Sequence, residues 1–146
     1  MRTTLIRLLQ GLCLLPGTAL FIGLLTCQLQ QACQVLAWPL LTEPDGHLVI
    51  ELALACVPAF ALFLLAAACG LLRRAQPVTV LLVFALCAAF AAYCAVNLLA
   101  NAYGNTWTAG EIFHELFLNN LELLGLALLP SLGLLALLER LNRPRP

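Results

Sequence analysis

The chain has 146 residues, of which 63% are hydrophobic and only 10% charged, with a mean hydropathy of +1.00 and a formal net charge of zero. Soluble globular domains are roughly half apolar and a quarter charged, so this composition indicates that lipid is the solvent for most of the chain. Four spans of about 20 residues each would leave under half the chain for loops and tails, which excludes an additional soluble catalytic domain.

The basic residues are arginines, without any lysine, and they form three clusters beside apolar runs. They are Arg2, Arg7, Arg73, Arg74, Arg140, Arg143 and Arg145. Nucleic-acid binding requires a larger basic face than these clusters supply, so we expect no nucleic-acid partner. Arginine in place of lysine, together with abundant leucine and alanine, is typical of a high-GC bacterium.

The first apolar run, residues 5–27, predicts a membrane-spanning helix. Its core from Leu8 to Leu25 has 18 residues, which is longer than the core of about 7 to 15 residues in a secretory signal. Cys27 lacks the small preceding residue of a lipoprotein cleavage site, so we expect this helix to be retained. Pro16 near its middle predicts a kink, because proline cannot donate a backbone hydrogen bond.

The second and third apolar runs, residues 48–72 and 77–100, are separated only by residues 73–76. So short a connection predicts an antiparallel helical hairpin. Small residues that would let these helices approach closely are Ala66 and Gly70 in one run and Ala85, Ala88, Ala89, Ala92 and Ala95 in the other.

The fourth run, residues 112–138, follows a polar connection over residues 101–111. Thr108 and Glu111 have the S/T-x-x-E spacing of a capping box, which predicts that the helix itself begins at about residue 109. Pro130 predicts a second kink. Beyond the apolar run, Glu139 and Arg143 are spaced for an i, i+4 ion pair.

The arginines also predict the orientation of the chain. They flank the two termini and the 73–76 turn, whereas the connections over residues 28–47 and 101–111 contain no arginine or lysine. The positive-inside rule therefore predicts cytoplasmic termini and outward-facing connections. The expected fold is an all-α integral membrane protein, a single-domain up-down bundle of four transmembrane helices in the bacterial inner membrane.

Polar residues form a stripe at the start of the fourth helix. At about 100 degrees per residue, an arc of about 140 degrees holds Glu111, His114, Glu115, Asn119 and Glu122. Counting about 1.5 Å per residue from the arginines along straight helices places Glu122 near the outer lipid boundary rather than in mid-bilayer. One interpretation of the stripe is a solvated helix end. A second is a functional surface, either a contact for a partner or the mouth of a water-filled cavity.

A third interpretation is a divalent metal site. The same count puts His47 and His114 each about 39 Å from the arginines, so His47, Glu51, His114 and Glu115 would lie near one level. Imidazole and carboxylate ligands together suit divalent metals. However, Glu-x-x-His occurs once here, whereas a two-metal carboxylate bundle uses it twice. We therefore expect no cofactor, with a divalent metal as the alternative.

The seven cysteines make no CxxC and no zinc-type spacing. Cys27 and Cys33 are the two expected near the oxidising side, where they could pair as a disulfide. Phosphate loops, G-x-S-x-G and H-E-x-x-H are absent from the sequence, so no motif supports an enzyme.

The expected function is that of a small non-enzymatic membrane protein that packs its helices against a partner. Such a protein would be an accessory subunit, an assembly factor or an immunity-type protector, and homo-oligomers are an equivalent case. One alternative is a small oligomeric transporter or channel subunit that uses the stripe as an outer acidic vestibule. Another is an outer-face metal-binding or thiol-redox protein.

Overall fold

The computed structural model describes residues 2–29, 47–72, 76–102 and 107–142, and the side chains at 2, 3, 47, 48, 102 and 142 lie outside this description. The long helices are α1 (Arg2–Leu12), α2 (Leu14–Leu29), α4 (His47–Ala68), α5 (Pro77–Ala102) and α7 (Leu121–Asn142). The stretches that are long and apolar enough to cross a membrane are Thr4–Leu29, Val49–Ala68, Pro77–Asn101 and Ala109–Leu141. These helices suggest a membrane protein.

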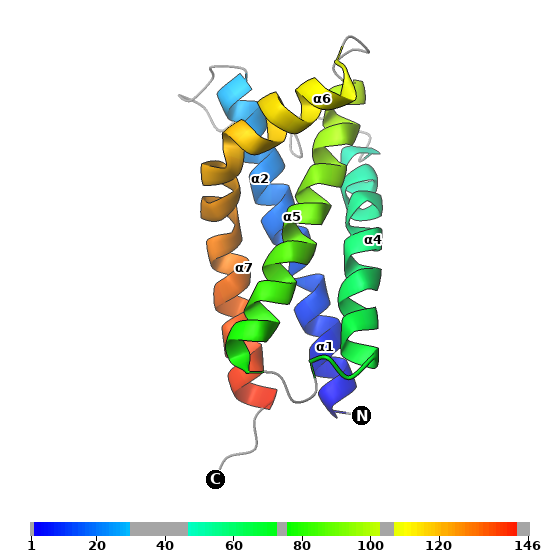
Figure 1. The fold of residues 1–146 in the computed structure, drawn as a ribbon, viewed down its shortest axis with the longest axis vertical. Coiled ribbons are helices and arrows are strands. Elements are labelled where there is room, and N and C mark those ends of the chain that lie inside the picture. The colour runs from blue at the N-terminus through cyan, green and yellow to red at the C-terminus, as the bar shows by residue number, and fades with distance from the viewer. Residues whose placement is uncertain (1, 30–46, 73–75, 103–106, 143–146) are drawn as a thin grey trace.

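The long helices form an up-down bundle (Figure 1). Helices α2 and α5 pack against each other through the middle, and each also contacts α4 and α7, which lie on opposite sides. The helix formed by α1 and α2 is the most buried of the four. Helix α1 begins and helix α7 finishes at the same end of the bundle, as expected for an even number of antiparallel helices (Figure 1).

The core combines aromatic side chains with a face of small residues on α5. Phe63 and Phe84 pack edge to face, with ring centroids 6.0 Å apart and an interplanar angle of 89°. The buried alanines of α5 are Ala88, Ala91, Ala92, Ala95 and Ala100, while Ala85 and Ala89 are half-buried. The prediction of a small-residue packing face on this helix is thus largely confirmed, with Ala91 as an additional member.

The second helix ends earlier than predicted, at Ala68 instead of residue 72. Gly70 has a φ of +80°, a left-handed conformation that glycine adopts without strain and that terminates a helix. A Cβ atom on Gly70 would meet nothing within 4 Å. The prediction that Ala66 and Gly70 form a close-packing pair is therefore wrong, because Gly70 belongs to the turn.

The first helix is interrupted at Cys13, between α1 and α2. Pro16 has no N–H for the Leu12 carbonyl four residues before it. At the interruption the Cys13 N–H lies between the carbonyls of Leu9 and Gln10, at N···O distances of 3.3 and 3.2 Å. The irregularity predicted from Pro16 is present, one turn before the proline. Helix α7, by contrast, continues through Pro130.

Candidate functional site

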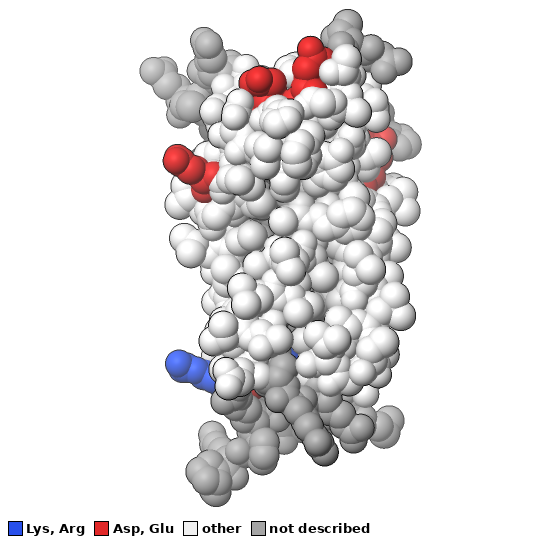
Figure 2. Space-filling model, viewed as in Figure 1, with Lys and Arg blue, Asp and Glu red and all other residues white. Residues whose placement is uncertain are grey.

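Charged side chains separate to the two ends of the bundle (Figure 2). We call the end where α4 begins the acidic end, because it carries the exposed residues Glu51, Glu111, Glu115 and Glu122. We call the other end, where α1 begins and α7 finishes, the arginine end. The apolar surface between them contains exposed leucines of α1, α4, α5 and α7 and exposed valines of α4 and α5.

A short segment, residues 109–120, lies across the acidic end before the chain turns into α7 (Figure 1). We call it the crossing segment; it comprises α6 (Ala109–Glu111), the π-helix η1 (Ile112–Phe117) and the 3₁₀ helix η2 (Leu118–Asn120). Its start is the predicted capping box: the Thr108 N–H donates to Glu111 Oε2 at 2.7 Å, and the Glu111 N–H donates to Thr108 Oγ1 at 3.4 Å.

The change of direction into α7 depends on Asn120. This side chain is only 7% exposed, and its Nδ2 donates to the carbonyls of Glu115 at 2.9 Å and Leu116 at 3.1 Å. It thereby satisfies main-chain carbonyls at the junction where the π-helix η1 is followed by the 3₁₀ helix η2. The straight helix assumed in the depth count is wrong, because the crossing segment, which contains His114, lies across the bundle end instead of continuing the α7 axis (Figure 1).

The apolar side of the crossing segment is anchored on α5 by aromatic contacts. The Tyr93 ring lies 5.8 Å from that of Phe113 and 5.6 Å from that of Phe117, both in edge geometry. Ile112 and Leu116 are buried beside them. The predicted polar stripe faces outward, and its five members Glu111, His114, Glu115, Asn119 and Glu122 are all exposed.

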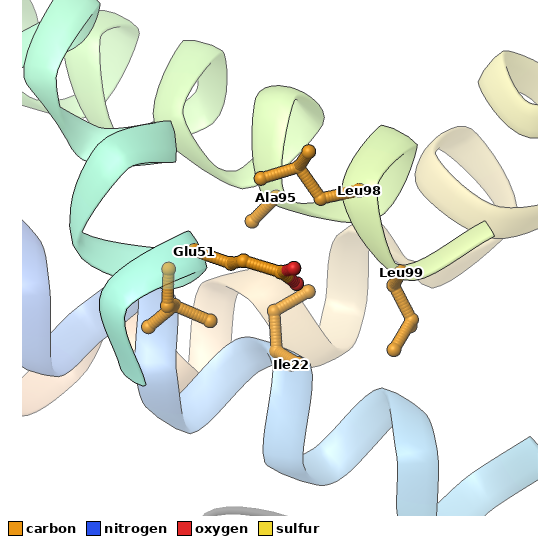
Figure 3. A pocket seen from close by; sticks show the side chains of 6 residues that line it. Ile22, Glu51, Ala95, Leu98 and Leu99 are labelled. Atoms are coloured by element: carbon orange, nitrogen blue, oxygen red, sulfur yellow. The ribbon is translucent and has the colours of Figure 1, made fainter. Parts of the chain in front are cut away.

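Glu51 is separate from that stripe. Figure 3 shows its carboxylate directed from α4 toward α2 and α5, among Ile22, Ala95, Leu98 and Leu99. The hollow there has a volume of about 10 Å³, which is room for about one water molecule. Within the described part of the chain, no hydrogen-bond donor to this carboxylate is found.

Glu51, His114 and Glu115 are the predicted metal ligands whose side chains the structure describes. The Glu115 carboxylate accepts a hydrogen bond from Asn119 Nδ2 at 2.9 Å, and the His114 ring packs on Phe113 with centroids 5.5 Å apart. No three His, Cys, Asp or Glu residues among those described form a metal-binding group. The His47 side chain lies outside the described residues, so the set with Glu51 stays a prediction.

The predicted disulfide also includes a residue that the structure does not describe. Cys27 lies half-buried near the end of α2 and has no disulfide partner among the described residues. Cys33 lies outside them, so its pairing with Cys27 stays a prediction.

An ion pair that was not predicted lies at the arginine end. Arg7 Nη1 is 2.8 Å from Glu139 Oε2 and 2.7 Å from Gln10 Oε1, and Arg7 Nη2 donates to the Leu72 carbonyl at 2.9 Å. Gln10 Nε2 donates to the same Glu139 oxygen at 3.0 Å. We call these four residues the arginine clasp, because they join α1, α7 and the chain just beyond α4.

The sequence had suggested a different partner for Glu139, namely Arg143, which lies outside the described residues. The available signal was the spacing of Arg7 and Gln10, two polar residues one helical turn apart inside the first apolar run. Both are now found buried.

The chain was also compared with known proteins. No protein-family model, curated protein or solved structure matches it.

Proposed function

We propose that the chain is a multi-pass protein of the bacterial inner membrane that acts by packing against a helix of a partner membrane protein. Both termini would lie in the cytoplasm and the crossing segment on the outer side. The described arginines lie at one end of the bundle and four of the five described glutamates at the other, Glu139 being the exception, and this distribution supports the orientation through the positive-inside rule. The exposed leucines and valines of the long helices suit a lipid environment.

The observation that carries the proposal is a groove between α4 and α5. It has a volume of about 450 Å³ and opens on the side of the bundle, between the two helices. It is lined by Leu54, Ala55, Pro58, Tyr93, Cys94, Asn97 and Leu98. One of its α5 residues is Tyr93, whose ring contacts the crossing segment. A groove along two helices fits the side chains of a third helix.

The groove also carries polar acceptors in apolar surroundings. Pro58 has no N–H to donate to the Leu54 carbonyl, which therefore lacks its usual helical partner. Asn97 Nδ2 donates to the Tyr93 carbonyl at 2.8 Å, and its amide oxygen has no partner among the described residues. Unsatisfied acceptors in hydrocarbon are unfavourable, so a partner helix with Ser, Thr or Asn donors at this position would be stabilised.

Site-specific photo-crosslinking in native membranes tests the proposal. A photoreactive residue at Leu54 or Leu98 is expected to give one discrete heterologous product. The same residue at Leu86 of α5, which is 72% exposed but does not line the groove, is expected to give none. Asn97→Leu should reduce the Leu54 product severalfold, because it removes the amide oxygen from the groove.

Two outcomes would contradict the groove assignment. One is an equal yield of the same product from Leu86 and from the groove positions, which would indicate random collision. The other is a Leu54 product that persists unchanged in Asn97→Leu. A product containing only this chain would replace the heterologous partner by a homo-oligomer.

A further inference from the structure

A second hollow, separate from the proposed partner groove, lies between α5 and α7 at the arginine end. Its volume is about 280 Å³. It is lined by Pro77, Val80, Leu81, Leu135, Ala136, Glu139 and Arg140. Pro77 and Ala136 are exposed and Leu81 is half-buried, so these three residues form the accessible apolar wall, while Val80 and Leu135 are fully buried. Glu139 and Arg140 lie nearer the end of α7. The hollow is therefore amphipathic along the bundle axis.

The charges at its polar end do not cancel each other. The Glu139 carboxylate is already paired with Arg7 at 2.8 Å and accepts a further hydrogen bond from Gln10. Arg140 is exposed and makes no ion pair with a described residue. One positive charge is thus left beside an apolar hollow, and a guanidinium binds phosphate oxygens well.

We propose that this hollow binds an anionic glycerophospholipid, with its phosphate at Arg140 and an acyl chain along Pro77, Leu81 and Ala136. The inference rests on the proposed function in one respect, that the helices cross a membrane with Arg140 at the headgroup level. A water-soluble phosphate compound would satisfy Arg140 but would leave the apolar walls uncovered. A phospholipid matches both parts of the hollow.

Native mass spectrometry of the purified full chain in mild detergent tests the site. Phosphatidylglycerol is expected to bind about fivefold more tightly than phosphatidylcholine, the effect of about one arginine near a membrane surface. Arg140→Gln should abolish that preference. Ala136→Trp should fill the hollow and weaken binding of both lipids, whereas Leu137→Trp, an exposed neighbour that does not line it, should change neither.

Further measurements distinguish a phospholipid from a free phosphate compound. They also distinguish failure of the lipid site from failure of the proposed function. Millimolar glycerol phosphate should not displace phosphatidylglycerol, and full displacement would overturn the lipid assignment. A preference that survives in Arg140→Gln, or equal effects of the two tryptophans, would also overturn it. A chain that stays monodisperse without detergent would instead refute the membrane premise, before any lipid is added.

Discussion

Arg7→Leu is expected to lower the free energy of unfolding by about 3 kcal/mol, the typical effect of removing one partner from a buried ion pair. The side chains of Arg7 and Glu139 are 10% and 12% exposed, so the Glu139 carboxylate that loses its partner has little access to water. The Leu72 carbonyl loses its guanidinium donor in the same substitution. Reversible unfolding in mixed micelles, followed by circular dichroism, measures the change.

The matched variants distinguish pairing from simple loss of charge. The double variant Arg7→Leu/Glu139→Leu should regain at least about half of the lost stability, because apolar pairs often replace buried ion pairs without penalty. Arg140→Leu, one residue beyond Glu139 but exposed, should change stability by less than about 0.5 kcal/mol. If the double variant is no more stable than Arg7→Leu, the arginine clasp is not held together by this ion pair.

Gly17→Ala should destabilise the contact between α2 and α7 by about 1 to 3 kcal/mol, the usual range for overpacking a filled interior. An added Cβ would lie 2.9 Å from Ser131 Oγ and 3.0 Å from a methyl carbon of Leu128. Ser131 is fully buried, and its hydroxyl has no hydrogen-bond partner among the described residues. The thermal midpoint in detergent provides the measurement.

Ser131→Ala should partly rescue the Gly17→Ala variant. It removes the Oγ atom and leaves the Ser131 Cβ at 3.5 Å, an ordinary van der Waals distance, while the 3.0 Å contact with Leu128 remains. Gly133→Ala on the same helix serves as control: its added Cβ meets nothing within 4 Å, so stability should stay the same or rise by up to about 1 kcal/mol. A loss from Gly133→Ala equal to that from Gly17→Ala would contradict this account, because it would show that the loss does not come from the close contact of residue 17 with Ser131 and Leu128.

Features that depend on residues close together in the sequence could be predicted from the sequence alone. The capping box of Thr108 and Glu111, the start of α5 at Pro77 and the interruption before Pro16 are all set by local backbone chemistry. The end of α4 was missed although its signal is also local. Gly70 can either pack in a helix or end one, and an apolar run that continues to Leu72 concealed the second role.

Features that depend on residues far apart in the sequence could not be predicted from the sequence alone. Arg7 and Glu139 are 132 positions apart, and Gly17 meets Ser131 only after α2 and α7 have packed. The path of the crossing segment similarly requires Tyr93 of α5 as an anchor and Asn120 as a donor to main-chain carbonyls. A helical count along one segment contains none of this information, so the polar stripe was identified but its position was not.

The orientation of the bundle in the membrane is the central claim, and thiol labelling tests it most directly. In variants with a single cysteine, an impermeant maleimide is applied to spheroplasts before and after the membrane is opened. Gly110→Cys, at the exposed start of the crossing segment, should label at once, whereas native Cys69, exposed near the arginine end, should label only after opening. The reverse pattern would contradict the orientation, and labelling of both cysteines in closed spheroplasts would contradict a bundle that separates its two ends across the membrane.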